Sequence, residues 1–563
     1  MLSKYVPFLV WMKEYKRSYL RYDLVAGATI WAVMVPTALA YTSIIEVDPI
    51  VGLYTVPLTL LMYAVFGTSK CLVVGPDSAT ALLSAHIVGT LAVMHSHHYM
   101  MLTSALALFI GTVFVVFGTF KMGWIANFIS IPVMRSFIQG LAIVTMMTQL
   151  SKMFGVPSVE GNFVHRLLSL IRHLDQTHFI TLGIAVGALG LLYIIPKISD
   201  RIPNAIVTVI IGILVVYLFD LEAEGVAVVG SIEGSLPPFQ IPEFALKDTS
   251  TLLLGALAIV LLNYTESLGA AKEAAERRGE QIDTNQELIG LGAANIGASL
   301  SSGFVVAGSL SQSTVSMLAG GKTQMSNVFH GAFILLTLLF LMPLFENLPL
   351  CVLGAIVTYA MLRVMDYRVF TSLFRANRPE FWIGVATFLA VILVGVLEGV
   401  GLGILLSLGL LIYHNSRPKL EILGKLEGAD VFKSIAIHSN ARSFDHILIV
   451  RFGASLFYAN AGYLVDQLRH LSYHTNPLIK HIIVDVERAA TVDITAMILI
   501  EELHKDLEKR GITLAFARTN DDIKSEFAQM VERQELKSLF LFDTISEAVS
   551  AFDSKRAKKQ KGD

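Results

Sequence analysis

Two segments far apart in the chain share one arrangement of residue types. Residues 73–80 read Val-Val-Gly-Pro-Asp-Ser-Ala-Thr, and residues 305–312 read Val-Val-Ala-Gly-Ser-Leu-Ser-Gln. Each segment has a short apolar lead with β-like residues, then a break at glycine, then the polar start of a helix. The arrangement predicts, in both places, a backbone break that leads directly into a helix N-terminus.

A helix N-terminus carries unpaired N–H groups and the positive end of the helix dipole, and it therefore attracts anions. Two such ends that face each other would form an anion site without a fixed cation. Either segment taken alone could equally be a kink or a tightly packed turn, but the pair favours a site. The candidate substrate-binding residues are Pro76, Asp77 and Ser78 at the first start and Ser309, Ser311 and Gln312 at the second.

Glu266 lies in an apolar stretch with small neighbours, Leu261–Gly269. A carboxyl group inside a membrane is costly, so it is a functional candidate by default. Removed from water, it can hold a proton near neutral pH, and it could then carry that proton together with an anion. It could also help to bind Na⁺. In the alternative interpretation, Glu266 lies near the cytoplasmic end of its helix and caps it or pairs with Lys272.

Pro36 interrupts another apolar stretch. A proline inside a helix frees a carbonyl group and kinks the chain. Thr37 and Tyr41, which follow it, are candidates to line the same site. A kink that serves only packing is equally consistent with these residues.

Long apolar runs supply the elements that must position these residues. A helix needs about 20 apolar residues to cross a membrane, and runs of this kind recur between Leu24 and Tyr413. The Gly-containing segments are the third and the tenth of these runs, at matching positions in two halves, 24–220 and 251–415. Broken helices at matching positions are the best sequence indication of a transporter site. The fourteen predicted spans are 24–45, 50–68, 72–92, 100–120, 127–149, 178–196, 203–219, 251–271, 286–303, 308–320, 325–345, 350–363, 380–396 and 399–415.

Basic residues predict the orientation of these spans. With the N-terminus inside, the loops on the outer side hold only Lys152, Arg166, Arg172 and Lys247. This strong bias predicts a multi-pass protein of the inner (cytoplasmic) membrane with both termini in the cytoplasm, residues 1–23 forming a cytoplasmic or interfacial segment. The cations assigned to the cytoplasmic side are Lys4, Lys13, Lys16, Arg17, Arg21, Lys70, Lys121, Lys197, Arg201, Lys272, Arg277, Arg278, Lys322, Arg363, Arg368, Arg375 and Arg378.

Composition narrows the class of protein further. The 563 residues are 54% hydrophobic and only 16% charged, whereas soluble domains carry about 25% charged residues. The net charge of −2 gives no reason to expect nucleic acid as a partner. Cys71 and Cys351 both lie beside apolar runs, so we expect packing residues rather than a disulfide or a metal pair. No Walker motif is present, and we expect no cofactor, no metal and no enzymatic activity.

The pattern changes after the last apolar run. Strands are predicted at His446–Phe452, Lys480–Val486 and Ile512–Ala517, alternating with helices at Ala461–Leu471 and Ile494–Arg510. Such alternation indicates a small α/β domain with a largely parallel sheet, without any catalytic motif. Further helical stretches are expected at 521–532 and 545–552. The predicted boundaries are 24–416 for the transmembrane domain, 429–553 for the α/β domain and 554–563 for a charged tail.

Several separated motifs, in this order, resemble the SulP anion permease family, in which a membrane domain precedes a STAS domain. The α/β pattern of the tail resembles the STAS part. The matching stretches are Asp23–Gly27 leading to Pro36 and Ala40–Tyr41, Gly52–Tyr54, Gly75–Pro76, Ile282–Leu288, Ala294–Gly297, Gly308–Ser311 and Gly320–Gln324.

The resemblance implies a polytopic α-helical protein with fourteen spans in a 7+7 inverted repeat with two half-helices, a fold shared with nucleobase transporters. It implies a substrate between spans three and ten, completed by spans one and eight, and an elevator-like movement, often in a homodimer. Substrates of the family include sulfate, bicarbonate, chloride, oxalate and dicarboxylates. The residues carried over to the site are Thr37, Pro76, Asp77, Glu266, Ser309, Ser311 and Gln312.

This sequence departs from the family pattern at several positions. Gln312 stands where many animal members have arginine, and Thr37 stands where many relatives have glutamine. Asp77 brings a negative charge to a helix start, where it would complement the dipole but compete with a bound anion. Glu266 matches an acidic position that is aspartate in some Na⁺-coupled bicarbonate members, and glutamate here favours proton coupling slightly.

In the STAS-like tail, Asp493–Ala496 aligns with a loop that carries a phosphorylatable serine in related sporulation regulators. Asp493 and Thr495 are therefore regulatory candidates, although either could simply cap a helix.

Together these features predict a secondary active transporter of a small inorganic or carboxylate anion, with proton-coupled sulfate symport first. The alternatives are a bicarbonate transporter, sodium-coupled in some versions, a dicarboxylate transporter, and a passive exchanger or channel. A membrane-anchored sensor without transport is disfavoured by the two broken spans, and a nucleobase transporter by the STAS-like tail and the Gly-Ser-Leu-Ser motif.

Overall fold

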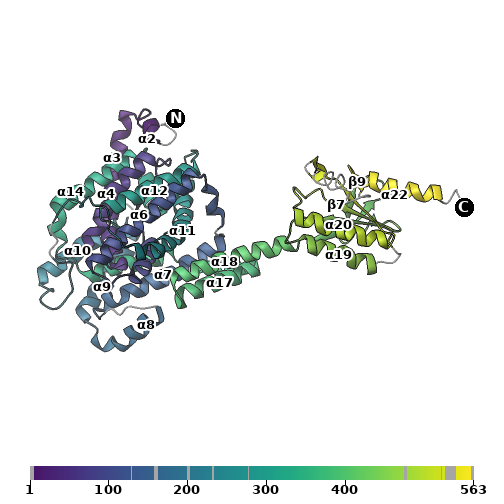
Figure 1. The fold of residues 1–563 in the computed structure, drawn as a ribbon. Coiled ribbons are helices and arrows are strands. Elements are labelled where there is room, and N and C mark those ends of the chain that lie inside the picture. Colours follow the sequence, from purple (N-terminus) through teal and green to yellow (C-terminus); the bar gives the residue numbers. More distant parts are fainter. Residues whose placement is uncertain are drawn as a thin grey trace. The chain divides into compact units, whose positions relative to one another are not determined.

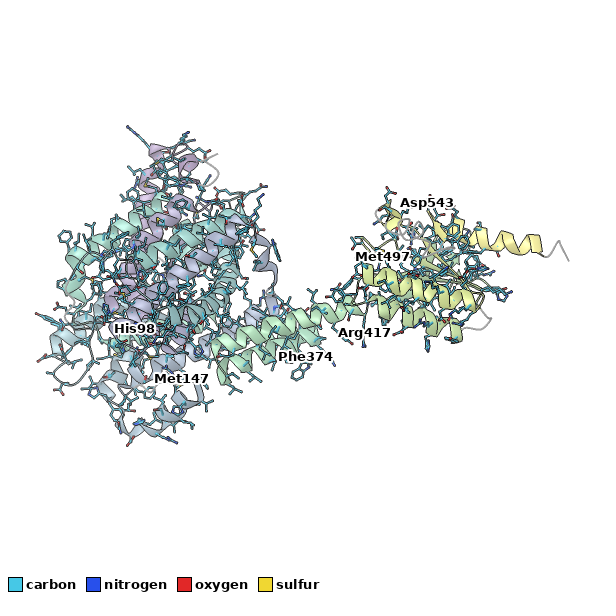
Figure 2. The ribbon with its side chains drawn as sticks, in the orientation of Figure 1. His98, Met147, Phe374, Arg417, Met497 and Asp543 are labelled. Atoms are coloured by element: carbon cyan, nitrogen blue, oxygen red, sulfur yellow. The ribbon has the colours of Figure 1, made fainter. Side chains whose placement is uncertain are left out.

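The computed structural model describes residues 6–128, 130–157, 163–199, 203–230, 234–276, 278–474, 479–521, 523–525 and 540–559. The predicted cytoplasmic cations Lys4, Arg201 and Arg277, most of the helix expected at 521–532 and the end of the charged tail lie outside these residues. The chain divides into two compact units, Met1–Ser407 and Leu408–Asp563, and the division falls within one helix (Figures 1 and 2).

The first unit is chiefly helical, and each of the fourteen segments predicted to be apolar spans contains a helix or most of one. Within the described residues, nine helices are long and apolar enough to cross a membrane, and two shorter apolar helices are α5 and α10. The number of crossings therefore stays a prediction. The first half contains α3 (Leu20–Ile45), α4 (Pro49–Phe66), α5 (Ser78–Gly89), α6 (His97–Thr119), α7 (Ile131–Phe154), α9 (Phe179–Ile198) and α10 (Asn204–Phe219). The second half contains α11 (Thr249–Glu276), α12 (Thr284–Leu300), α13 (Leu310–Leu318), α14 (Met325–Leu336), α15 (Leu350–Val364), α17 (Arg378–Leu393) and α18 (Val396–Ser416).

Shorter elements connect these helices. α2 (Phe8–Trp11) and a 3₁₀ turn (Arg17–Tyr19) precede α3, and α8 (Phe163–Arg172) and α16 (Arg368–Ala376) lie in segments expected to be loops. After α14 the chain forms a π-helical turn over Thr337–Leu341.

Helix contacts repeat between the two halves when each helix is exchanged for its counterpart. α6 packs on α12 as α14 packs on α4, and α3 packs on α14 as α11 packs on α6. Likewise, α7 contacts α17 as α15 contacts α9. This exchange is the pattern that two structurally repeated halves produce.

The helices also form two groups. α3–α6 pack chiefly with α11–α14, whereas α7 and α9 pack with α15 and α17. α3 supplies the main contacts between the groups, through α10 and α15.

Loops assigned to one side of the membrane lie at one end of the unit. The segments that follow α4, α11 and α13 line one cavity together with the N-terminal segment. Residues that follow α3, α7 and α10 line a different cavity. Loops that the predicted topology puts on the same side thus lie together, and the two sets line separate cavities.

The second unit is built on a seven-stranded sheet in the order β4-β3-β6-β7-β8-β9, with β5 paired to β3. β6, β7, β8 and β9 are parallel, as predicted for most of the sheet, and β3 joins β6 in the antiparallel sense. The strands are β3 (Leu420–Leu426), β4 (Phe432–Ser434), β5 (Ala441–Arg442), β6 (Ile447–Phe452), β7 (His481–Asp485), β8 (Thr513–Ala517) and β9 (Phe540–Phe542).

Helices cover both faces of this sheet (Figure 1). α19 (Ala461–His474) and α20 (Ile494–Lys509) bury their apolar residues against one face, and α22 (Ile545–Lys559) covers the other. The sheet begins at Leu420, before the boundary of 429 that the sequence suggests.

Candidate functional site

The two Gly-containing segments pair with each other. β1 (Val73–Pro76) and β2 (Val306–Ser309) form a two-stranded antiparallel ribbon in which Val73 lies opposite Ser309. Each strand leads directly into a helix, β1 into α5 and β2 into α13. The structure thus has the strand, break and helix start that the sequence pattern predicts in both places.

The antiparallel pairing places both helix N-termini at the ribbon. α5 leaves the ribbon after Pro76 and α13 leaves it after Ser309, at the opposite end. At about 3.3 Å per strand residue, the capping residues Asp77 and Ser309 are roughly 13 Å apart along the ribbon. The positive ends of both helix dipoles therefore lie on this short ribbon.

Three polar side chains that the sequence analysis did not assign hold β2 in place. The amide nitrogens of Asn263 and Asn295 donate to the carbonyl oxygen of Val306 at 2.7 and 3.1 Å. The N–H of Val306 donates to Asn295 Oδ1 at 3.1 Å, and the N–H of Gly308 donates to Ser267 Oγ at 2.7 Å. These bonds satisfy backbone groups that would otherwise be unpaired inside the membrane.

β1 is held by the opposite half of the unit. The N–H of Val73 donates to Ser313 Oγ at 2.9 Å. Gln324 and Asn327 donate their amide N–H groups to the carbonyl of Leu72 at 3.1 and 2.8 Å. All six of these side chains belong to the second half, residues 251–415, which therefore fixes both strands of the ribbon.

Glycine is required where the ribbon approaches its neighbours. A Cβ at Gly308 would lie 3.0 Å from the Cβ of Ser267 and 3.0 Å from a methyl group of Leu72. A Cβ at Gly75 would lie 2.5 Å from the terminal methyl of Met34. Both glycines allow a neighbouring side chain to pack closely against the ribbon. Only Gly308 faces a Cβ atom, which is fixed to its helix.

At the α5 start, Asp77 is the N-cap. Its Oδ2 accepts hydrogen bonds from the N–H groups of Ala79 at 2.9 Å and Thr80 at 3.1 Å. The neighbouring Pro76 and Ser78 are buried, and Asp77 is half-buried. The carboxylate therefore already occupies part of the anion-binding end of this helix.

At the α13 start the cap is weaker. Ser309 Oγ accepts from the N–H of Gln312 at a long 3.4 Å and lies 3.1 Å from Ser311 Oγ. Ser311 is exposed. Among the described residues, no side chain accepts from the N–H groups of Leu310 or Ser311, so this end keeps donors available.

Gln312 is buried beside the ribbon. Its Nε2 lies 3.5 Å from Met34 Sδ, and within the described part of the chain its Oε1 has no hydrogen-bond partner. This position supplies an amide rather than a cation to the α13 start.

Glu266 and Tyr41 lie on helices that flank the ribbon. Both are half-buried, and the helices that carry them, α3 and α11, both pack against α5. Lys272 does not pair with Glu266, which has no ion-pair partner among the described residues. The structure thus brings two carboxyl groups and a phenol together beside the α5 start.

Thr37 is also half-buried, but its hydroxyl has local partners. Thr37 Oγ1 donates to the carbonyls of Val33 at 3.0 Å and Met34 at 3.1 Å, in the turn before Pro36. It thereby satisfies carbonyl groups of its own helix.

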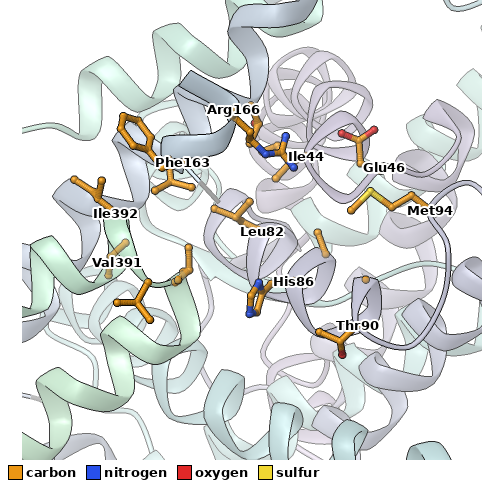
Figure 3. A pocket seen from close by; sticks show the side chains of 17 residues that line it. Ile44, Glu46, Leu82, His86, Thr90, Met94, Phe163, Arg166, Val391 and Ile392 are labelled. Atoms are coloured by element: carbon orange, nitrogen blue, oxygen red, sulfur yellow. The ribbon is translucent and has the colours of Figure 1, made fainter. Parts of the chain in front are cut away.

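A cavity of about 330 Å³ lies farther along α5, against α7, α8 and the turn between α17 and α18 (Figure 3). Figure 3 shows the side chains of Glu46, His86 and Arg166 around it. His86 Nε2 lies 3.4 Å from a carboxylate oxygen of Glu398. None of the predicted site residues is among the described residues that line this cavity.

In the second unit, Asp493 caps α20. Its two oxygens accept from the N–H groups of Ala496 at 2.8 Å and Tyr458 at 2.7 Å. Thr495 is exposed in the first turn of the same helix. Asp493 thus has the capping position that the sequence left open as an alternative to regulation.

Family models match both units of the chain. The model of the sulfate permease family matches residues 20–387, and the model of the STAS domain matches residues 438–548.

Similar curated proteins span almost the same length. A probable sulfate transporter of Mycobacterium tuberculosis is 31% identical over 97% of this chain and 98% of its own length. The chloroplastic sulfate transporter 4.1 of Arabidopsis thaliana is 29% identical, over 93% of this chain and 79% of its own length.

Solved structures share the fold at low identity. Murine Solute Carrier 26 family member A9, described as an anion transporter in the inward-facing state, matches with a TM-score of 0.90 and 20% identity over 98% of this chain and 94% of its own. The transmembrane domain of the cyanobacterial bicarbonate transporter BicA matches with a TM-score of 0.61 and 20% identity, over 70% of this chain and 99% of its own.

Proposed function

Since the chain belongs to the sulfate permease family, we propose that it is a secondary active transporter that couples entry of a small anion, sulfate in the first place, to entry of protons. The relatives of highest similarity reported above are named as sulfate transporters, which supports this choice of anion. The substrate site would lie on the β1–β2 ribbon, between the starts of α5 and α13.

The observation that carries the proposal is the available α13 N-terminus. This end offers hydrogen-bond donors that carry no positive charge. They are the N–H groups of Leu310 and Ser311 and the hydroxyl groups of Ser309 and Ser311. Backbone donors and a helix dipole suit an anion that must be released again, since they hold it without forming a permanent ion pair.

The coupling ion would be a proton shared near Asp77 and Glu266. Two carboxylates close together in a low-dielectric site repel each other and also repel a dianion. Protonation of one of them would remove a negative charge when the anion binds. Since Glu266 has no ion-pair partner in the part of the chain that the structure describes, a proton is the simplest neutralising group, and Na⁺ is the alternative.

Movement of one helix group against the other would expose the site alternately to the two sides. Polar contacts join α3 and α7 near one end of the unit, and such a movement would have to break them; besides an ion pair of Lys152 with Glu46 at 3.9 Å, there are two hydrogen bonds among the described residues. Lys152 Nζ donates to the carbonyl of Ser43 at 2.9 Å, and Ser43 Oγ donates to Gln149 Oε1 at 3.0 Å. These bonds would break and re-form in an elevator-like cycle. The protein would work as a homodimer in the inner membrane, with both termini in the cytoplasm.

Uptake of radiolabelled sulfate into proteoliposomes tests the proposal. We expect accumulation against a concentration gradient when the outside is more acidic, and only equilibration without a proton gradient. Bicarbonate, fumarate and chloride serve as competitors, and an inward Na⁺ gradient replaces the proton gradient in a parallel arm. Accumulation driven by Na⁺ alone, or uptake of bicarbonate or fumarate without sulfate uptake, would overturn the coupling ion or the substrate.

A further inference from the structure

A cavity of about 560 Å³ lies where the N-terminal segment meets the loops after α4, α11 and α13. It shares no residue with the ribbon site. The residues that line it are Trp11, Glu14, Lys16, Tyr19, Lys70, Arg278, Glu280, Lys322 and Thr323.

Cations outnumber carboxylates in this cavity, four to two. Lys70 Nζ lies 3.7 Å from Glu280, which partly balances one charge. Among the described residues, the side-chain ammonium groups of Lys16 and Lys322 have no carboxylate partner, and Lys16 is exposed. The cavity is therefore net positive and open to an anionic group.

The walls of this cavity are fixed by contacts across the fold. Arg278 donates to the carbonyls of Gly321 at 2.7 Å and Lys322 at 3.0 Å, which ties the loop after α11 to the loop after α13. Trp11 Nε1 donates to the carbonyl of Ala64 at 3.0 Å, which holds the N-terminal segment against α4. The cations thus lie on segments that are held together before any ligand binds.

An exposed apolar surface lies on the segments that form the rim. Leu9, Val10 and Met12 are exposed on and beside α2, and Leu20 and Tyr22 are exposed at the start of the membrane helix α3. Lys322 Nζ lies 5.5 Å from the centre of the Tyr22 ring, so the charged and the apolar surfaces adjoin. Exposed apolar and aromatic residues at the end of a membrane helix are typical of the lipid interface.

We propose that this cavity binds the phosphate headgroup of an anionic phospholipid, with the acyl chains against the exposed apolar residues of α2 and α3. A phosphodiester matches a cluster of lysine and arginine donors, and basic pockets at the ends of membrane helices bind such headgroups. A free anion would match the cations but would leave the apolar rim unexplained.

Lipid titration of the purified full-length protein tests the proposal. Phosphatidylglycerol or phosphatidylcholine is added in mild detergent, and bound lipid is counted by native mass spectrometry. At about 1 kcal/mol per basic residue near a charged headgroup, Lys16→Gln with Lys322→Gln should weaken phosphatidylglycerol binding by about thirtyfold. Phosphatidylcholine binding should be the same in both proteins.

The matched control is Lys13→Gln with Lys433→Gln, which removes the same charge from two exposed lysines outside the cavity. It should bind phosphatidylglycerol as the unmodified protein does. Unchanged binding in the cavity double variant, or equal loss in the control, would overturn the site. Full displacement of phosphatidylglycerol by inorganic phosphate or sulfate would show that the cavity binds a free anion, and it would overturn the proposal that the ligand is a lipid. Because the readout is lipid binding, failure here leaves the transport proposal untouched.

Discussion

The starts of α5 and α13 occupy matching places in the two halves, and their backbones are paired strand to strand, but their chemistry differs. The Asp77 carboxylate accepts hydrogen bonds from N–H groups at the start of α5, whereas Ser309 caps α13 weakly and leaves N–H donors available. A repeated backbone therefore does not produce a repeated site. The α13 start is suited to hold an anion, and the α5 start brings a negative charge that favours a proton nearby.

The largest effect should come from filling the α13 start. Ser311→Trp places an indole beside the free N–H groups of Leu310 and Ser311, so we expect sulfate uptake into proteoliposomes to fall to the level of protein-free vesicles. Leu318→Trp, at the exposed far end of the same helix, is the control and should retain uptake. Normal uptake by Ser311→Trp would move the site away from α13.

The two carboxylates should then separate coupling from binding. Glu266→Gln keeps the shape of the side chain but cannot exchange a proton. We expect it to lose pH-driven accumulation while it still exchanges labelled for unlabelled sulfate at equal pH. Accumulation with the pH dependence of the unmodified protein would exclude Glu266 as the coupling residue.

Asp77→Asn keeps a good N-cap and removes the negative charge at the α5 start. A carboxylate about 13 Å from a sulfate dianion costs about 2.6 kcal/mol at an effective dielectric constant of about 20, so the Asn variant should bind sulfate about eightyfold more tightly at neutral pH. Isothermal titration of the purified protein measures this change. Weaker binding would mean that the Asp77 carboxyl supports the anion rather than opposing it.

A smaller effect concerns the packing of the ribbon. Gly308→Ala meets the Cβ of Ser267, which cannot move without its helix, so it should lower the free energy of unfolding by about 1–3 kcal/mol. Gly75→Ala meets the flexible end of Met34 and should cost less. Apparent melting temperatures in detergent compare the two variants, and the reverse order would show that β1 is the more constrained strand.

The smallest effect is expected at Thr37. Because its hydroxyl donates to carbonyls of its own helix rather than to a ligand, Thr37→Val should change the KM for sulfate by less than about twofold. Uptake kinetics measure the change. A rise in KM of tenfold or more would place the hydroxyl on the substrate.

The positions of the membrane helices could be predicted because long apolar runs have few alternatives. The short helices α8 and α16 were expected to be loops, since ten and nine residues are too few to cross a membrane and carry no long apolar run. In the second unit, β6, β7 and β8 are confirmed. The sequence does not predict β3, β4, β5 and β9, because each is defined by a partner elsewhere in the sheet rather than by its own pattern.

The site was predictable only where local pattern determines structure. Gly-Pro and Gly-Ser breaks indicated both helix starts, and the structure pairs them. Asn263, Ser267 and Asn295 were not assigned, although a polar residue within an apolar run is a usable signal. Their role depends on bonds to Val306 and Gly308, and the direction of the Thr37 hydroxyl likewise depends on the folded helix.

The ribbon also sets the order in which this protein can be made. Val73 donates to Ser313, 240 positions later, so at about 5–20 residues per second β1 waits roughly 10–50 s for its partner. During that time its backbone groups lie at the level of the membrane without their final acceptors, each at a cost of several kcal/mol. The first half is therefore an incomplete insertion unit. Its early helices must be held by the insertion machinery, or kept from the hydrocarbon, until the second half has been synthesised.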